Sequence, residues 1–318
     1  MAHIDARCVG AELYFLPVTT RVPLKFGHEI LTSVTCARVR LTIVDKEGNR
    51  AEGWGETPIS VQWAWPGSLS YEVRHVRMKE FCEILARSWA EFDHWGHPID
   101  VGHAFIESAL PGLLERFNAG AGEPGMPWLA ALICCSAFDI AFHDAYGHLH
   151  GRPVYELYSA PYMSRDLSHY LTPAAKGVSF AGKYPADFLV TPPERLLAWH
   201  LVGGTDPLRH DEPGTDVNDG YPVVLDDWIT ADGLACLKIK LRGNDFAWDY
   251  RRIVDVGRIA VERGVIWLTC DFNCTVLDVQ YVIDMLDRLL VEHPRIYAMI
   301  LYVEQPFPYE LERYSFDV

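Results

Sequence analysis

The chain has 318 residues, enough for one large domain or two ordinary ones, and its 49% apolar and 22% charged residues are typical of a globular protein. Its formal net charge of −15 argues against a nucleic-acid partner, because phosphates require a basic surface. None of the eight cysteines forms a CxxC pair, which excludes zinc-ribbon and thioredoxin-like sites.

The sequence predicts a cytoplasmic protein without a membrane partner. The N-terminal stretch MAHIDARCVG has no apolar signal core, and no segment approaches the ~20 apolar residues of a spanning helix. The scattered cysteines are typical of small buried apolar residues in a reducing compartment.

Residues 1–150 predict a small sheet with a helical layer. Alternating strands are expected at 7–17, 33–44 and 51–56, with a polar turn, DKEGNR, before the third. The segment 19–33 between the first two contains Pro and Gly and predicts a loop. Helical spacing follows at 70–92, 102–117 and 128–146, and we interpret the whole as an N-terminal α+β domain.

Residues 151–318 change to an α/β rhythm. A short strand is expected at 167–171, followed by a Pro/Gly/Asp-rich stretch at 172–232. Strands at 234–241, 265–270 and 298–303 then alternate with helices at 246–263 and 276–292, a pattern that predicts a parallel sheet. Because βα connections are usually short, 172–232 is interpreted as an inserted lid or specificity loop; a surface excursion is the alternative.

Chemistry-bearing side chains stand at the carboxyl ends of three successive predicted strands. Lys238 and Lys240 lie on one face of the first, Asp271 and Asn273 follow the second, and Glu304 ends the third. Successive ends are separated by 31 (240 to 271) and 33 (271 to 304) residues, close to the ~30 residues of a βαβ unit. Taken singly, each residue has a structural explanation, as a solvated lysine, a turn, a cap or a surface acid. Their coincidence favours a site.

Two neighbouring carboxylates at strand ends are suited to Mg²⁺, which prefers oxygen ligands. An amine beside a cation and an apolar wall has a lowered pKa, so one lysine can act as a base, and each lysine would lower the pKa of the other. This combination predicts abstraction of a proton next to a substrate carboxylate, with the metal stabilising the enediolate.

At these residues the chain resembles the enolase superfamily, in its mandelate racemase/muconate lactonizing enzyme branch. The resemblance covers nearly all of the chain and is carried by FDIAFHDAYGHLHGRPVYELY (138–158), LKIKL (237–241), CDFN (270–273) and YVEQP (302–306). It implies an α+β capping domain, 1–150, followed by an α/β barrel of the TIM type, 151–318, with the insertion at about 172–232.

The resemblance also implies roles for the site residues. Asp271 and Glu304 would be Mg²⁺ ligands and Lys240 the acid/base. Lys238 would lower the pKa of Lys240 or contact the substrate carboxylate, and Asn273 would line the substrate site. In the capping domain, the segments 19–33 and GWGETP (53–58) would close over the substrate.

Two features depart from that pattern. The family has a third acidic ligand on the next strand, which by the ~30-residue repeat would fall near position 335, beyond residue 318. Only about four barrel strands are recognisable here, where a closed barrel needs eight. We therefore expect either part of a longer protein or a product without catalytic activity.

Three functional hypotheses follow. The first is a Mg²⁺-dependent isomerase or lyase acting on a small carboxylate, by racemisation, epimerisation, cycloisomerisation or dehydration of a carboxylic or sugar acid. The second is a metal-independent Schiff-base lysine aldolase. The third is a non-catalytic, truncated relative that serves as a binding module. Homo-oligomerisation remains open.

Overall fold

The structure, a computed structural model, describes residues 4–26, 29–120, 124–212, 217–308, 314 and 316. By its contacts the chain divides into two compact units. Unit 1 comprises Met1–Val18 and Val34–Pro192, and unit 2 comprises Thr19–Ser33 and Pro193–Val318. The domain boundary near 150 and the insertion at 172–232 remain predictions, because a division by contacts does not decide them.

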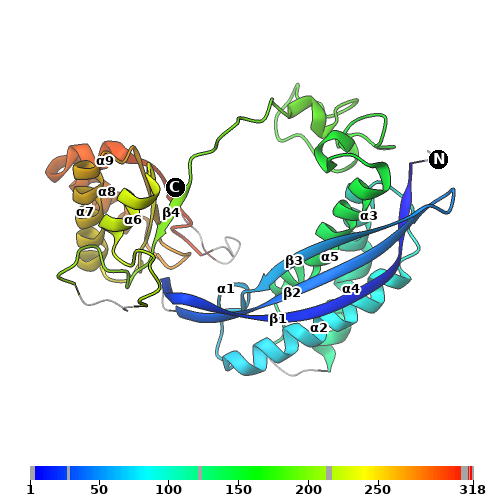
Figure 1. The fold of residues 1–318 in the computed structure, drawn as a ribbon, viewed down its shortest axis with the longest axis horizontal. Coiled ribbons are helices and arrows are strands. Elements are labelled where there is room, and N and C mark those ends of the chain that lie inside the picture. Colours follow the sequence, from blue (N-terminus) through cyan, green and yellow to red (C-terminus); the bar gives the residue numbers. More distant parts are fainter. Residues whose placement is uncertain are drawn as a thin grey trace. The chain divides into compact units, whose positions relative to one another are not determined.

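Unit 1 contains most of the three-stranded sheet β1-β2-β3 (Figure 1). β1 is Ala6–Phe26, β2 is Glu29–Asp45 and β3 is Arg50–Ile59; β2 and β3 pair antiparallel, with Val39 opposite Gly55. The three predicted strands are confirmed, but the expected loop at 19–33 is wrong. Apart from residues 27 and 28, which lie outside the described residues, that segment continues β1 and β2.

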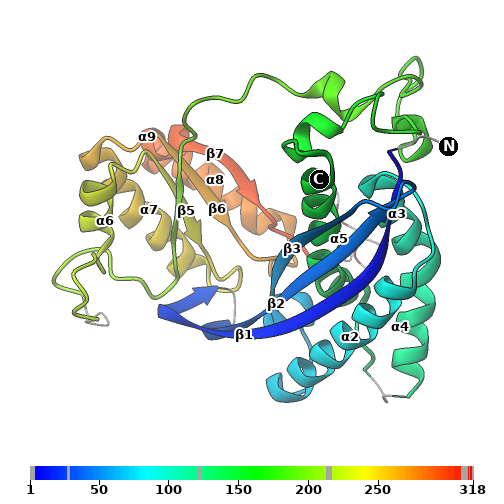
Figure 2. The same cartoon turned by 45° about the vertical axis from the view of Figure 1, so that its right-hand side comes forward.

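Helices cover one face of this sheet (Figures 1 and 2). They are α1 (Val61–Ala64), α2 (Tyr71–Glu91), α3 (Pro98–Ala104), a π-helical turn (Phe105–Ala109), α4 (Leu110–Ala119) and α5 (Trp128–His150). Ser70 caps α2 by accepting a hydrogen bond from the Val73 amide. The helix expected at 102–117 is divided by the π-turn, and Pro111 lies in the first turn of α4, where its missing N–H costs nothing.

Two glycines bring β3 unusually close to α5. A Cβ on Gly55 would lie 2.0 Å from the Ala137 carbonyl oxygen, and one on Gly53 would lie 2.0 Å from the Ala145 amide nitrogen. The motif GWGETP therefore belongs to a packed strand rather than to a loop that could close over a substrate. By length and composition α5 could span a membrane, contrary to our expectation, but half of its most apolar stretch is buried inside the protein.

The strand predicted at 167–171 is also wrong. Residues Leu167–His169 form a 3₁₀-helix, and the Asp166 side chain accepts the Ser168 amide at its start. Two further 3₁₀-helices lie nearby, at Val154–Leu157 and Pro185–Phe188. A short polar side chain that satisfies the backbone locally competes with strand pairing, and hydrophobic alternation does not reveal this.

Unit 2 contains a four-stranded parallel sheet in the order β4-β5-β6-β7 (Figure 2). The strands are β4 (Trp199–Val202), β5 (Cys236–Lys240), β6 (Trp267–Asp271) and β7 (Ile300–Glu304). The helices are α6 (Leu225–Asp232), α7 (Phe246–Arg263), α8 (Val279–Glu292) and α9 (Pro294–Met299). The last three predicted strands and both helices are confirmed, whereas β4 and α6 lie within the stretch expected to be an insertion.

Alternation along β5 separates a core face from a polar face. Leu237 and Ile239 are fully buried in a cluster with apolar residues of α7 and with Leu268 and Cys270 of β6. Lys238 and Lys240 take the opposite face. Asp245 caps α7 by accepting the Trp248 amide, and Asp278 caps α8 by accepting the Gln280 amide.

The hairpin tip, residues 19–33, is part of unit 2. The Arg21 guanidinium makes two hydrogen bonds to the Asp219 carboxylate, at 2.6 and 2.7 Å, and also donates to the carbonyls of Tyr221 and Pro222. The Gly204 amide donates to the Lys25 carbonyl at 2.9 Å. Unit 2 is thus assembled from two stretches that are far apart in the sequence.

Candidate active site

The parallel register brings the predicted site residues together at one edge of the sheet. Lys240 of β5 pairs with Asp271 of β6, and Asp271 pairs with Glu304 of β7. Register partners in a parallel sheet project to the same face at the same level. Three strand ends therefore present an amine and two carboxylates side by side, and Lys238 lies two residues below Lys240 on the same face.

Direct contacts connect the five predicted site residues, which are Lys238, Lys240, Asp271, Asn273 and Glu304. The Lys238 Nζ lies 2.6 Å from Glu304 Oε1 and 3.1 Å from Asp271 Oδ2. The Lys240 Nζ lies 2.5 Å from Asp271 Oδ2 and 2.9 Å from Asn273 Oδ1. The Asp271 side chain is only 1% exposed, so two ammonium groups compensate a carboxylate that is removed from water.

The electrostatics of Lys238 differ from the sequence-based expectation. Burial lowers the pKa of Lys238, but its hydrogen bonds to Glu304 and Asp271 outweigh burial and raise the pKa above the ordinary value. The net direction for Lys238 is therefore opposite to the lowering expected beside a cation, while the effect of one lysine on the other stays a prediction.

Residues that sequence reasoning missed support the loops above the site. Asp249, fully buried on α7, accepts the amides of Arg242 and Gly243 and the hydroxyl of Tyr281. Burial raises the pKa of Asp249. The Thr275 hydroxyl contacts the same turn by donating toward the Arg242 carbonyl at 2.7 Å. The sequence does contain a signal for this role, because Asp249 lies in the first turn of α7, a helix that follows a turn with Gly243.

The side-chain oxygens at this edge of the sheet are of the type that binds a hard cation. Asp271 and Glu304 offer carboxylate oxygens, which Mg²⁺ prefers. The Lys238 ammonium lies within 3.1 Å of both carboxylates, so the structure already places positive charge between them. Within the part of the chain that the structure describes, no group of three or more His, Cys, Asp or Glu side chains is arranged to hold a metal. Among the described residues, Asp271 and Glu304 are the two carboxylates that this edge of the sheet supplies.

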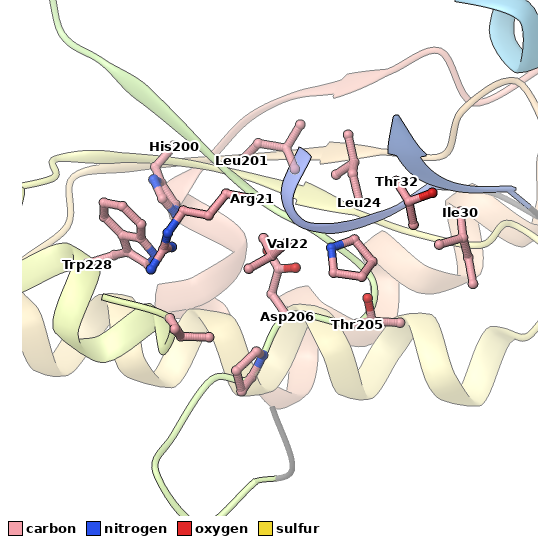
Figure 3. A pocket seen from close by; sticks show the side chains of 13 residues that line it. Arg21, Val22, Leu24, Ile30, Thr32, His200, Leu201, Thr205, Asp206 and Trp228 are labelled. Atoms are coloured by element: carbon pink, nitrogen blue, oxygen red, sulfur yellow. The ribbon is translucent and has the colours of Figure 1, made fainter. Parts of the chain in front are cut away.

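A pocket of about 580 Å³ opens in unit 2 between the hairpin tip, the end of β4 and α6 (Figure 3). Its walls are mostly apolar, with Leu24, Ile30 and Leu201 among them. Leu201 is the register partner of Lys238, whereas His200, which also lines the pocket, is the register partner of Leu237 on the core face. On the other side, His200 and Arg21 lie against Trp228, and burial lowers the pKa of His200.

Comparison with known proteins gives a result at the level of fold. No family model matches the chain, and no curated protein matches it in sequence. Solved structures do match. An enolase from Bradyrhizobium, complexed with magnesium and mandelic acid, has a TM-score of 0.55 and 19% identity over 96% of this chain and 63% of its own. Over 96% of its length the chain therefore shares the fold of this enolase.

Two other solved structures give similar values. A dipeptide epimerase from Enterococcus faecalis V583, complexed with Mg and L-Leu-L-Tyr, has a TM-score of 0.55 and 16% identity, with 96% and 63% of the two chains covered. An N-succinyl Arg/Lys racemase from Bacillus cereus ATCC 14579 has a TM-score of 0.52 and 17% identity, with 95% and 60% covered. The chain thus spans about three fifths of the length of these enolase-fold proteins.

Proposed function

We propose that this chain carries part of the active site of a Mg²⁺-dependent enzyme that removes the proton next to a substrate carboxylate. The observation that carries the proposal is the convergence of Lys238, Lys240, Asp271 and Glu304 at three adjacent strand ends. The enolase-superfamily fold supports it, because that fold carries epimerases and racemases in the solved structures named above.

Asp271 and Glu304 would hold the cation. When bound, Mg²⁺ would supply positive charge to the substrate oxygens that become negative as the proton leaves. Lys240, held between Asp271 and Asn273, would exchange the proton with the substrate carbon. Lys238, the more exposed of the two amines at 24% against 13%, would neutralise the carboxylates or contact the substrate carboxylate.

Racemisation or epimerisation is the reaction outcome that the named structures favour, while cycloisomerisation and dehydration remain within the proposal. The substrate would be a small carboxylic acid. The apolar wall formed by Leu24, Ile30 and Leu201 would suit an apolar substituent of the substrate.

The architecture we propose is an α+β capping domain at about 1–150 and, from 151, the first strands of a TIM-type barrel. We also propose a cytoplasmic location, which the eight unpaired cysteines support.

The two other hypotheses differ in their support. A Schiff-base aldolase needs a neutral amine, and the raised pKa of Lys238 disfavours that residue as the nucleophile. A non-catalytic binding module gains support from the two-carboxylate donor set, since the described residues form no cluster of three.

Calorimetric titration with Mg²⁺ tests the proposed metal site. The wild-type chain should bind the ion, and Asp271→Asn and Glu304→Gln should each weaken binding, because each removes an anionic oxygen. Unaltered affinity in both variants would exclude the site. Hydrogen exchange at the α-carbon in D₂O, followed by NMR over a panel of mandelate, dipeptides and N-succinyl amino acids, then tests the reaction.

A further inference from the structure

The side chain of Asn273 has its hydrogen-bonding capacity almost filled by the protein itself. Its Nδ2 donates to the Leu241 carbonyl at 3.0 Å and to the Asp271 carbonyl at 3.1 Å. Its Oδ1 accepts from Lys240 Nζ at 2.9 Å. An amide offers two N–H donors and one oxygen, so both donors are used and only one acceptor position is left for a substrate.

The orientation of this amide is fixed by its partners. Backbone carbonyls can only accept and a lysine ammonium can only donate, so the amide nitrogen must face Leu241 and Asp271 and the oxygen must face Lys240. The Asn273 backbone amide also donates to Asp271 Oδ1 at 2.8 Å. One residue therefore contacts the end of β5, the end of β6, the buried carboxylate and the amine.

The backbone at this position is held in a left-handed conformation. Asn273 has φ 54° and Cys274 has φ 61°, and Gln305, at the end of β7, has φ 43°. Asn tolerates this region better than most residues with a side chain. Hydrogen bonds between the two loops hold it in place, from the Cys274 amide to the Gln305 carbonyl at 2.7 Å and from the Val276 amide to the Pro306 carbonyl at 2.9 Å.

We infer that Asn273 is a positioning residue that holds the Lys240 ammonium against Asp271, rather than a substrate-binding residue. It acts from a left-handed turn at the end of β6 that aims its amide oxygen across to β5. Without that oxygen, Lys240 would keep its contact with Asp271 but lose one of the contacts that fix its direction. The inference rests on the proposed function only for the role of Lys240 as the acid/base. The contacts of Asn273 are present without metal or substrate.

Lysine acetylation kinetics on the metal-free chain test the inference. The protein is treated with N-hydroxysuccinimidyl acetate, and the labelling rates of Lys240, Lys238 and the exposed Lys183 are followed by peptide mass spectrometry. In Asn273→Gly, which keeps the left-handed backbone but lacks the amide, the Lys240 rate relative to Lys183 should rise about tenfold, the scale of one hydrogen bond to a charged group. The Lys238 rate should stay within about twofold of wild type, because no hydrogen bond of Lys238 to Asn273 is lost.

Asn273→Asp is the matched variant, because it restores an acceptor for Lys240 while removing both donors to the carbonyls. It should keep Lys240 protected although its melting temperature falls, which separates positioning of the amine from general stability. An unchanged Lys240 rate in Asn273→Gly, or an equal rise for Lys238 and Lys240, would overturn the inference. Mg²⁺ titration is scored separately, so failure of the proposed metal site and failure of this inference are distinguishable.

Discussion

Asp271 and Glu304 are register partners on β6 and β7, and their carboxylates are bridged by the ammonium of Lys238. A divalent cation held by the same two carboxylates would compete with Lys238 for their oxygens. The structure therefore shows how the pair can be neutralised in two alternative ways, by an internal amine or by an added cation.

This competition predicts the behaviour of Lys238→Met. Without Mg²⁺, the free energy of unfolding should fall by about 1.5–3 kcal/mol, because Asp271 and Glu304 lose a charged hydrogen-bond partner. Saturating Mg²⁺ should restore more stability to the variant than to wild type, since the cation then replaces the missing charge. Urea unfolding with and without Mg²⁺ measures both quantities.

Lys183→Met is the control for that experiment, because Lys183 is exposed and lies outside the site. It should leave both the stability and the Mg²⁺ response close to wild type. If Mg²⁺ stabilised wild type and Lys238→Met equally, the cation would not share the carboxylates with Lys238.

Replacement of Lys240 tests the proposed acid/base. Lys240→Ala should reduce α-proton exchange into a responsive substrate by about 10²–10⁴-fold, the range for loss of general acid–base catalysis. Mg²⁺ affinity should remain measurable, because both carboxylates are retained. Exchange is followed by NMR in D₂O, and a rate equal to that of wild type would remove Lys240 from this role.

The close approach of β3 to α5 predicts a large cost for Gly55→Ala. The added methyl group would lie 2.0 Å from the Ala137 carbonyl oxygen. Because that oxygen belongs to the main chain, a side-chain rotation cannot relieve the clash, and β3 or α5 must move. We expect a loss of about 1–3 kcal/mol or more, the range for overpacking. Gly67→Ala, where nothing lies within 4 Å of the new atom, should be nearly neutral in the same denaturation assay.

His97 gives a pH-dependent prediction for unit 1. It is 1% exposed at the start of α3, where its Nδ1 accepts the Ile99 amide, and burial lowers the pKa of His97 to about 3. The folded protein therefore keeps His97 neutral, whereas the unfolded chain takes up a proton near pH 6.5. Stability from this group is present above pH 6.5 and is lost as the pH falls toward 3.

His97→Asn removes the titrating ring and keeps a side chain suited to a helix N-cap. Between pH 7 and pH 5, wild type should lose about 2 kcal/mol more unfolding free energy than the variant. His143, whose pKa burial lowers to about 4, and Asp139, whose pKa burial raises to about 6, are present in both proteins. Equal pH slopes in urea unfolding would contradict the prediction.

Much of unit 2 and of the site follows from local sequence pattern. Strand-forming alternation predicts the segments of β5, β6 and β7, and the ~30-residue spacing predicts that Lys240, Asp271 and Glu304 lie at one level. The contacts that join them then follow from parallel register. Their chemical roles remain proposals.

The misplaced elements have physical causes. β4 is only four residues long, and its neighbours are Pro- and Gly-rich, so its signal is lost among turns. The sequence of the hairpin tip contains Pro23 and Gly27, which predict a loop. Contacts with residues far along the chain, such as that of Arg21 with Asp219, make it part of unit 2. The raised pKa of Lys238 depends on carboxylates of two other strands, Asp271 and Glu304. The sequence of β5 alone shows only the neighbouring lysine, so it predicts the opposite direction.

The hairpin tip, finally, bears on how the chain can be made and divided. Residues 19–33 are synthesised before the stretch that completes their compact unit, since residue 33 precedes residue 193 by 160 positions (193 − 33). During synthesis Arg21 must therefore wait for Asp219, and Lys25 for Gly204. Expression of residues 193–318 alone would omit one wall of the pocket beside β4. Dissection of this protein into separately folded pieces would need to graft the hairpin onto the second piece.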